Sequence, residues 1–247
     1  MNVNWKKSFI ILIDTVLAVY LVLAITAFNR PDELSDVCKE VKIDIAEGEV
    51  KGFLTPDEIK HQLQHARLYP LGDPMSQVSA RRIEEALVKN AFVESAQCYK
   101  TQSGRVFIKL TQRLPVARVK ADNGDDYYVD THGNIMPNTQ HASDLVVVTG
   151  HVTKQYAKRV LPPVGNYLIQ HKIWRSQVEQ LNVLSDGSLE LVPRVGDHVV
   201  YLGQPTGIAR KLERLEKFYK YGLSKAGWNK YSYISLEFDN QIICKKR

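Results

Sequence analysis

A run of twenty almost entirely apolar residues, Phe9 to Phe28, constrains this chain more than any other feature. An α-helix rises about 1.5 Å per residue, so a helix over this run covers about 30 Å, the thickness of a bilayer's hydrocarbon core. A cleaved signal peptide is disfavoured, because its apolar region has roughly 7 to 15 residues and ends at a small-x-small site that is not present here. A buried core helix is disfavoured because no face of the run is polar. The sequence predicts an uncleaved transmembrane helix.

The charges around this run predict its orientation. Lys6 and Lys7 precede it, whereas Arg30 after it is offset by two acids, so the positive-inside rule places residues 1–8 in the cytoplasm and the body of the chain outside it. Asp14 is the one charge inside the run. Two interpretations of it stay open: an acid tolerated near the interface, or a hydrogen bond to a partner's membrane helix.

Composition indicates an ordered body after this helix. Hydrophobic residues make up 44% and charged residues 24%, which does not fit a disordered chain. The net charge of +6 comes without a basic run interleaved with aromatics, so no nucleic acid is expected as a partner, whereas anionic lipid headgroups or cell-wall polymer suit a mild positive field. Cys38, Cys98 and Cys244 each lie in a strand-like run, where a buried thiol is the commonest meaning; a disulfide between two of them stays open.

After a linker over residues 29–37, the segment 38–113 has the pattern of one small α+β module. Its elements, in chain order, are a strand over Cys38 to Ala46, a helix capped by Thr55-Pro56-Asp57-Glu58 that ends near Arg67, a helix that begins at Ser79 and ends at Asn90, and a hairpin of Val93 to Lys100 with Arg105 to Gln112. Such a β-α-α-β-β unit packs two helices on one face of a three-stranded sheet.

These residues carry a family resemblance. The order of elements resembles a POTRA (polypeptide-transport-associated) module. Three runs of residues resemble the FtsQ/DivIB family of cell-division proteins. In that family a helix leads into a strand that begins "V-x-x-A", and an "I-x-V-x-E-R-x-P-V-A" passage then leads into a second domain. The matching runs are Asn90-Ala91-Phe92-Val93-Glu94-Ser95-Ala96, Arg105-Val106-Phe107-Ile108-Lys109-Leu110 and Gln112-Arg113-Leu114-Pro115-Val116-Ala117-Arg118. Gln112 stands where the pattern often has Glu. Pro115 cannot donate to a sheet ladder, so we expect Arg113 and Pro115 to form a hinge between domains 38–113 and 114–247.

The second domain, 114–247, reads as mainly antiparallel β with flanking helices. We expect strands over Val116 to Lys120, Tyr127 to Asp130, Leu145 to Thr149 (fully buried), Val178 to Leu184, Leu189 to Val192, Val199 to Leu202 and Tyr231 to Phe238, and helices over Thr153 to Leu161, Pro163 to Trp174 and Ile208 to Leu223. The acids around Asn123-Gly124 lack the spacing of a calcium loop and indicate a hairpin. The run Glu190 to Gly203 resembles the form that this domain takes in Bacteroidota members.

The last strands carry the predicted partner site. A strand that ends a chain often lies at a sheet edge, where another chain can add a strand. This edge resembles the site at which members of the FtsQ/DivIB family dock the small bitopic proteins FtsB (DivIC) and FtsL. The residues that we expect to contact a partner are Tyr233, Ser235, Glu237, Phe238, Asn240, Gln241, Ile242, Ile243 and Lys245. Ser235 and Glu237 stand where those family members carry "D-x-R". An alternative interpretation of the charged residues at the end of the chain is that they protect the edge strand from pairing with other chains.

No catalytic, cofactor or metal site is predicted. His61 and His65 lie four apart on the first helix, but Gln62 replaces the glutamate of a zinc-protease motif. His132, His141 and His151 lie near turns, and Ser143 lacks a nucleophile elbow.

The resemblance implies a non-catalytic scaffold at the division septum. It implies a single-pass protein of the inner membrane with a periplasmic body, whose partners are FtsB/DivIC, FtsL and, through them, the septal peptidoglycan synthase. The competing hypothesis is a POTRA-bearing secretion or outer-membrane assembly factor, for which about 130 residues after Arg113 leave little room. A cell-wall enzyme is the third.

Overall fold

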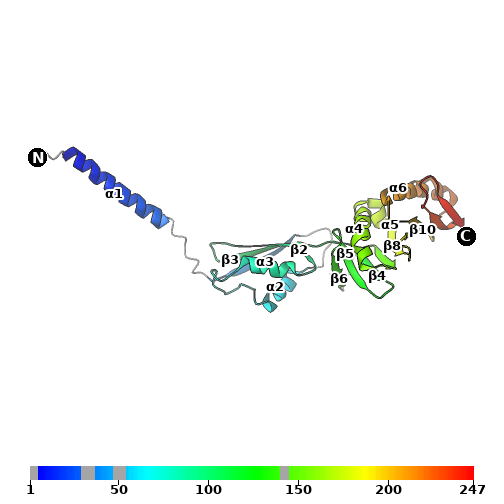
Figure 1. The fold of residues 1–247 in the computed structure, drawn as a ribbon, viewed down its shortest axis with the longest axis horizontal. Helices are drawn as coiled ribbons and strands as arrows, with labels where there is room; N and C mark the ends of the chain where they lie inside the picture. The colour runs from blue at the N-terminus through cyan, green and yellow to red at the C-terminus, as the bar shows by residue number, and fades with distance from the viewer. Residues whose placement is uncertain (1–4, 29–36, 47–53, 140–144) are drawn as a thin grey trace. The chain divides into compact units, whose positions relative to one another are not determined.

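The computed structural model describes residues 5–28, 37–46, 54–139 and 145–247 (Figure 1). Most of the predicted linker 29–37, together with His141 and Ser143, lies outside the described residues. The chain divides into two compact units, one of Met1–Asp44, Ile59–Leu87 and Ala96–Lys109 and the other of Ile45–Glu58, Val88–Ser95 and Leu110–Arg247.

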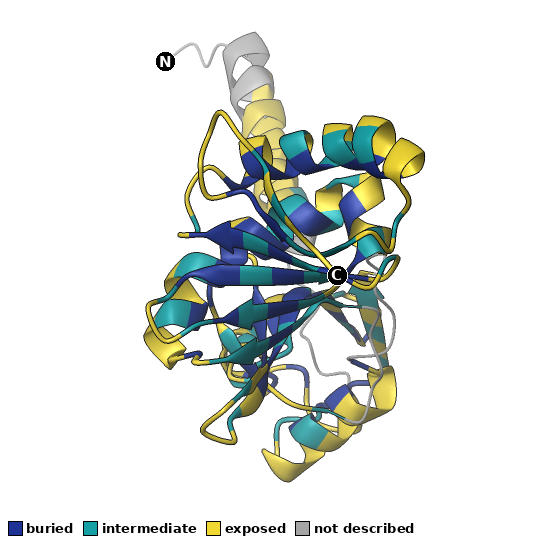
Figure 2. Ribbon diagram, turned by 90° about the vertical axis from the view of Figure 1, so that its right-hand side faces the viewer, coloured by how far each residue is buried: buried dark blue, intermediate teal, exposed yellow. Residues whose placement is uncertain are grey.

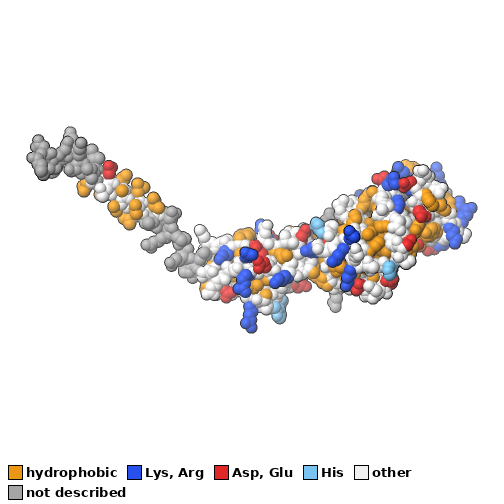
Figure 3. Space-filling view, in the orientation of Figure 1, with side chains coloured by type: hydrophobic (Ala, Val, Ile, Leu, Met, Phe, Trp, Pro, Cys, Tyr) orange, Lys and Arg blue, Asp and Glu red, His pale blue; other side chains and the backbone are white. Residues whose placement is uncertain are grey.

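Helix α1, Trp5–Phe28, begins four residues before the predicted apolar run and ends with it. Hydrophobic side chains cover its described part and are exposed, as is Asp14 (Figure 3). Across the described parts of the chain, no helix combines the length and the apolarity that a membrane span requires. The transmembrane character of Phe9 to Phe28 stays a prediction.

The predicted β-α-α-β-β order is confirmed. The elements are β1 (Glu40–Ala46), α2 (Pro56–His65), α3 (Ala80–Val88), β2 (Val93–Lys100) and β3 (Arg105–Gln112). Thr55 caps α2 with a reciprocal pair of bonds: the Glu58 backbone N–H donates to Thr55 Oγ1 at 3.2 Å, and the Thr55 N–H donates to Glu58 Oε2 at 2.9 Å. Ile59 and Leu63 of α2 and Ile83 and Leu87 of α3 are buried, so each helix turns one apolar stripe inward.

The sheet of this module has the order β1-β3-β2. Strand β3 therefore separates Cys98 on β2 from β1, which begins two residues after Cys38. Neighbouring strands lie about 4.8 Å apart, so two residues across a middle strand exceed the reach of a disulfide. The thiols of Cys38, Cys98 and Cys244 are all free. The structure therefore has no disulfide between Cys38 and Cys98.

A nine-stranded sheet forms the second module, in the order β12-β11-β10-β9-β8-β7-β4-β5-β6. The strands are β4 (Pro115–Ala121), β5 (Asp126–Asp130), β6 (Ile135–Pro137), β7 (Val147–Gly150), β8 (Val178–Val183), β9 (Leu189–Pro193), β10 (Val199–Gly203), β11 (Tyr231–Ser235) and β12 (Ile243–Lys246). Five of the eight neighbouring pairs are antiparallel, as predicted, and three, β4 with β7, β7 with β8 and β10 with β11, are parallel.

Helices α4 (Lys154–Gln170), α5 (Lys172–Gln177) and α6 (Ile208–Phe218) share one hydrophobic core with one face of this sheet (Figure 1). A π-helical turn, η1 (Tyr219–Leu223), and a short α7 (Ser224–Ala226) continue α6. The strand residues on that face lie in register from β7 to β11: Val148, Leu181, Leu191, Val200 and Ile234. Buried positions alternate with half-buried ones along these strands (Figure 2).

Three expectations for this module are wrong in detail. The break predicted between the helices Thr153 to Leu161 and Pro163 to Trp174 is absent: α4 continues through both prolines to Gln170, and Trp174 lies in α5. Ala157, Leu161, Val164 and Leu168 make one continuous buried stripe that holds both halves of α4 on the sheet. The strand predicted as fully buried, β7, buries only Val148. The sequence pattern of the helix Ile208 to Leu223 places Lys211 with Arg210, Glu213, Arg214 and Lys217 on the solvent side, but Lys211 is 7% exposed.

Candidate partner-binding edge

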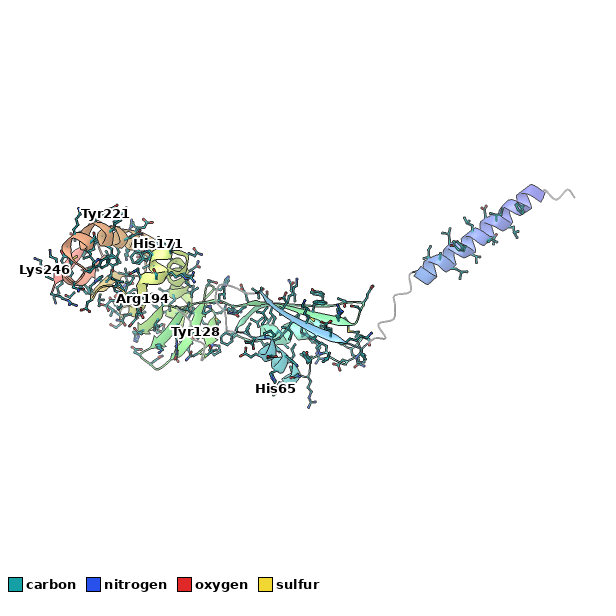
Figure 4. The ribbon with its side chains drawn as sticks, turned by 180° about the vertical axis from the view of Figure 1, so that it is seen from behind. His65, Tyr128, His171, Arg194, Tyr221 and Lys246 are labelled. Carbon is teal, nitrogen blue, oxygen red and sulfur yellow. The ribbon has the colours of Figure 1, made fainter. Side chains whose placement is uncertain are left out.

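The last strand of the chain lies at the edge of the nine-stranded sheet. Strand β12 pairs antiparallel with β11, and it comes first in the strand order, with no further described strand beyond it. An edge strand of this kind presents backbone N–H and C=O groups that another chain can pair with. Lys246 lies at the end of the second module opposite Tyr128 (Figure 4).

The pairing of β11 with β12 brings together four of the predicted contact residues. Tyr233 faces Lys245 across the two strands, and Ser235 faces Ile243. Because side chains alternate along a strand, these four lie on the face opposite the helices, while Cys244, opposite Ile234, packs against the core. Ile243 is 48% exposed, and Lys245 is exposed.

Tyr233 belongs to a small aromatic group on that outer face. Its ring stacks on that of Tyr201 of β10, with centroids 6.2 Å apart. Burial raises the pKa of Tyr233, and the charge of Glu190 raises it further, so this hydroxyl stays protonated at neutral pH. Tyr233 therefore offers a neutral, half-buried ring next to the edge.

The connection between the two strands holds the other predicted contact residues. Glu237, Phe238, Asn240 and Gln241 are exposed, Phe238 by 50%. Ile242 is half-buried and packs against the core. We call strands β11 and β12 with residues 236–242 the terminal edge.

The limits of these strands differ from the prediction. Strand β11 ends at Ser235 rather than Phe238. The run Gln241-Ile242-Ile243-Cys244 also predicts an extended segment, and the strand there, β12, covers Ile243–Lys246. Lys245 and Lys246 are thus part of the edge strand, not a charged tail after it. The alternation that suggested a strand up to Phe238 also fits a turn in which Leu236 is buried and Phe238 is exposed.

Sequence reasoning missed the residues that hold this edge in place. Arg210 and Arg214 of α6 contact the connection, and Arg247 contacts Asp197. Two features of the sequence could have indicated these contacts: the arginines lie four residues apart on the side of α6 predicted to face solvent, and the connection contains acidic residues. Lys211 lies between them: burial lowers its pKa, and the charges of Asp239 and Glu237 oppose that shift.

Arg113, one of the two predicted hinge residues, belongs to a largely buried polar network. Arg113 Nη1 lies 2.7 Å from Asp130 Oδ2, and their side chains are 17% and 2% exposed. The Arg113 backbone N–H also donates to the Phe92 carbonyl at 2.8 Å, and its Nη2 donates to the Val93 carbonyl at 3.2 Å. Pro115 is buried and begins β4, where its missing N–H costs least. The role of Arg113 and Pro115 as a hinge stays a prediction.

The histidines singled out in the sequence are dispersed. His61 and His65 are both exposed on α2. His151 Nδ1 lies 3.3 Å from Asp122 Oδ2 on the surface, and His132 Nδ1 lies 3.1 Å from the hydroxyl of Thr131. Among the described residues, no three His, Cys, Asp or Glu side chains come close enough to hold a metal ion.

A small β-α-α-β-β module followed by a nine-stranded sheet that ends in an open edge strand defines a two-module α+β protein. Two family models match the chain: one described as FtsQ/DivIB, C-terminal related, over residues 114–245, and one described as a POTRA-like domain, over residues 36–111. The chain belongs to the FtsQ/DivIB family and carries a POTRA module. No curated protein matches it.

Membership in this family makes the chain a cell-division protein of a generally non-catalytic kind. It also implies protein–protein interactions within the division machinery.

Proposed function

We propose that this protein is a non-catalytic, bitopic scaffold of the bacterial divisome. It binds the FtsB(DivIC)/FtsL complex by strand addition at β12, and so links early division proteins to septal peptidoglycan synthesis. The mechanism is geometric: holding these partners beside the membrane raises their effective concentration for the synthase that they control.

The observation that carries this proposal is the open edge of β12 beside exposed side chains. Main-chain groups of an edge strand supply affinity in strand addition, and alternate side chains supply specificity. On the outer face these side chains are Ile243 and Lys245, with the ring of Tyr233 next to them. A partner strand with an apolar residue opposite Ile243 and an acid opposite Lys245 would complement this face.

Membrane anchoring is the part of the proposal that depends on the sequence of Phe9 to Phe28. We expect the full chain to stay in the membrane fraction after alkaline carbonate extraction, with residues 1–8 protected from protease added outside the cytoplasm. Release of the chain by carbonate would refute the anchor and leave strand addition to be judged separately.

The test of strand addition is binding of the purified full chain to the extracytoplasmic segments of FtsB/DivIC and FtsL from the same cell. Truncation after Asp239 removes β12, and Ile243→Asp places a charge on its exposed apolar position. Both should abolish or strongly weaken binding, and Phe238→Ala should weaken it.

The matched control is Ile173→Asp on α5, because Ile173 is 40% exposed, close to the 48% of Ile243, and lies outside the terminal edge. This variant should bind normally. Binding that survives the truncation would move the contact to the POTRA module or to α1. No binding by the unaltered chain would favour the secretion or outer-membrane assembly alternative.

A further inference from the structure

Two arginines of α6 hold the connection that leads into β12. Arg210 Nη2 lies 2.8 Å from Asp239 Oδ1 and 2.7 Å from Asp239 Oδ2. One turn further along the helix, Arg214 Nη2 donates to the Gln241 carbonyl at 2.7 Å. These charge-assisted bonds fix the connection on both sides of Asn240, two residues before the strand begins.

A third arginine holds the other end of the strand. Arg247 Nη2 donates to the Asp197 carbonyl at 2.9 Å and also contacts the Asp197 carboxylate. The Arg247 backbone N–H donates to the Lys230 carbonyl at 3.3 Å. The Arg247 guanidinium lowers the pKa of the Asp197 carboxyl, so this contact is an ion pair at neutral pH.

The strand between these contacts has little else to fix it. Strand β12 has four residues, pairs on one side only, and has a burial pattern in which only Cys244 is shielded. Most of the connection is exposed. Fixing the backbone of a residue costs conformational entropy. A free strand of this kind would lose that entropy when a partner added to it, and its apparent affinity would fall.

We propose that Arg210 and Arg214, together with Arg247, are positioning residues that preorganise β12 for the partner strand. This inference rests on the proposed function and adds to it the features that keep the edge ready. The arginines act through Asp239, the Gln241 carbonyl and Asp197, not through contact with the partner. Partner binding should therefore weaken with salt even where the added strand is uncharged, because salt screens exposed ion pairs.

Charge exchange tests this proposal. Arg210→Asp and Asp239→Arg each place like charges opposite one another, whereas the double variant restores an opposite pair in reversed order. We expect each single variant to weaken binding of the FtsB(DivIC)/FtsL segments by about three- to tenfold, as for loss of a surface ion pair plus repulsion. The double variant should recover to within about twofold of the unaltered chain. Full recovery is not expected if Arg210 itself contacts the partner.

The matched control is the exposed pair of Arg81 and Glu85 on α3, whose Nε and Oε1 atoms lie 2.8 Å apart. Arg81→Glu should leave binding unchanged. Loss of binding in the double Arg210/Asp239 variant that equals the loss in the single variants would overturn the proposal.

Amide hydrogen exchange of the free full chain separates this proposal from strand addition itself. Residues 243–246 should exchange faster in each single variant and at the original rate in the double variant, with an unchanged midpoint of thermal unfolding. Unchanged exchange in the single variants overturns the preorganisation, whatever binding does. If the unaltered chain does not bind the partner segments, the proposed function fails, while the exchange result still decides whether the arginines order β12.

Discussion

At the scale of single residues, His198 is a buried titratable group that the sequence did not single out. It is 4% exposed, and its Nε2 lies 2.8 Å from the hydroxyl of Tyr219. The ring of Tyr219 also contacts those of Trp174 and Trp228. Burial lowers the pKa of His198, and the charge of Asp197 opposes that shift only in part. The imidazole is therefore held neutral in the folded protein.

This gives a prediction for the pH dependence of stability. Well above the usual histidine pKa of about 6.5, His198 is neutral in both the folded and the unfolded state and adds no pH dependence. As the pH falls below 6.5 the unfolded chain binds the proton first, so the free energy of unfolding decreases, by up to about 1.4 kcal/mol per pH unit. His198→Gln should flatten the slope of unfolding free energy between pH 7 and 5, measured by urea titration. His132→Gln, at an exposed position, should keep the slope; equal slopes in all three proteins would contradict the argument.

Gly133 is required by both its backbone and its surroundings. Its φ is +81°, and a Cβ atom built there would lie 2.3 Å from the carbonyl oxygen of Lys158 in α4. Gly133→Ala should lower the free energy of unfolding by roughly 2 to 4 kcal/mol, through strain and the forced shift of α4. Gly124 offers a comparison, because its φ is +87° with open space around it. Gly124→Ala should lower the free energy of unfolding by only about 1 kcal/mol. If urea titration shows similar losses for the Gly133 and Gly124 variants, the clash with α4 does not contribute.

At the scale of elements, Asp130 ties the β5–β6 turn to the segment that leads into β4. Its carboxylate accepts bonds from the backbone N–H groups of His132 at 2.8 Å and Asn134 at 2.7 Å, from the Asn134 amide at 2.8 Å, and from Arg113 at 2.7 Å. Burial alone would raise the pKa of Asp130, but these bonds outweigh it and the pKa is lowered. The stabilisation is thus present above the unfolded value near 3.9 and is lost as the pH falls through the lower folded value.

Removing this carboxylate should therefore be costly at neutral pH. We expect Asp130→Ala to lower the free energy of unfolding by about 3 to 5 kcal/mol, since it leaves the shielded Arg113 guanidinium without its counter-charge. Asp126 is the control, because its pair with Arg118 lies at 2.8 Å but with side chains 27% and 35% exposed. Asp126→Ala should cost about 1 kcal/mol or less. Chemical denaturation of both variants measures the difference, and equal losses would show that burial of the ion pair is unimportant.

The elements that the sequence predicted well have local signals. The β-α-α-β-β module followed from a capping box, an apolar stripe and turn residues that all lie within a few positions of the elements they define. The strands that it missed or shortened depend on the strands with which they pair. Strand β6 is three residues long and exists through its pairing with β5. The parallel pairings of β7 with β4 and β8 have no sequence signature, because their register is set by side chains far apart in the chain.

The terminal edge shows the same limit. Alternating residues predicted its strands, but not where the strands end. The sequence does not indicate that Lys211 is buried, because Lys211 is one of several charged residues on the polar side of α6. The Nζ of Lys211 donates to the Gln204 carbonyl at 2.8 Å, a partner that comes from the turn before α6 and not from the helix surface. Such contacts exist only once the turn and the helix have folded together.

At the scale of the whole molecule, the two compact units each have buried apolar residues of their own. Ile83 of α3 is 1% exposed and belongs to the first unit, while Leu212 of α6 is 0% exposed and belongs to the core of the nine-stranded sheet. A unit with its own core can open without the other. A scaffold that recruits through one module and binds through another would benefit from this independence, because a change in one would leave the other folded.

Matched core truncations test this independence. Ile83→Ala and Leu212→Ala each remove a buried side chain and should each cost about 2 to 5 kcal/mol in the unit concerned. In hydrogen exchange of the full chain, Ile83→Ala should speed exchange in β3 and α3 while leaving β8 to β10 protected, and Leu212→Ala should do the reverse. Partner binding at the terminal edge should then fall with Leu212→Ala and persist with Ile83→Ala. If either substitution speeds exchange in both units to the same extent, the two units fold as one cooperative body, and neither module can be altered in this chain without disturbing the other.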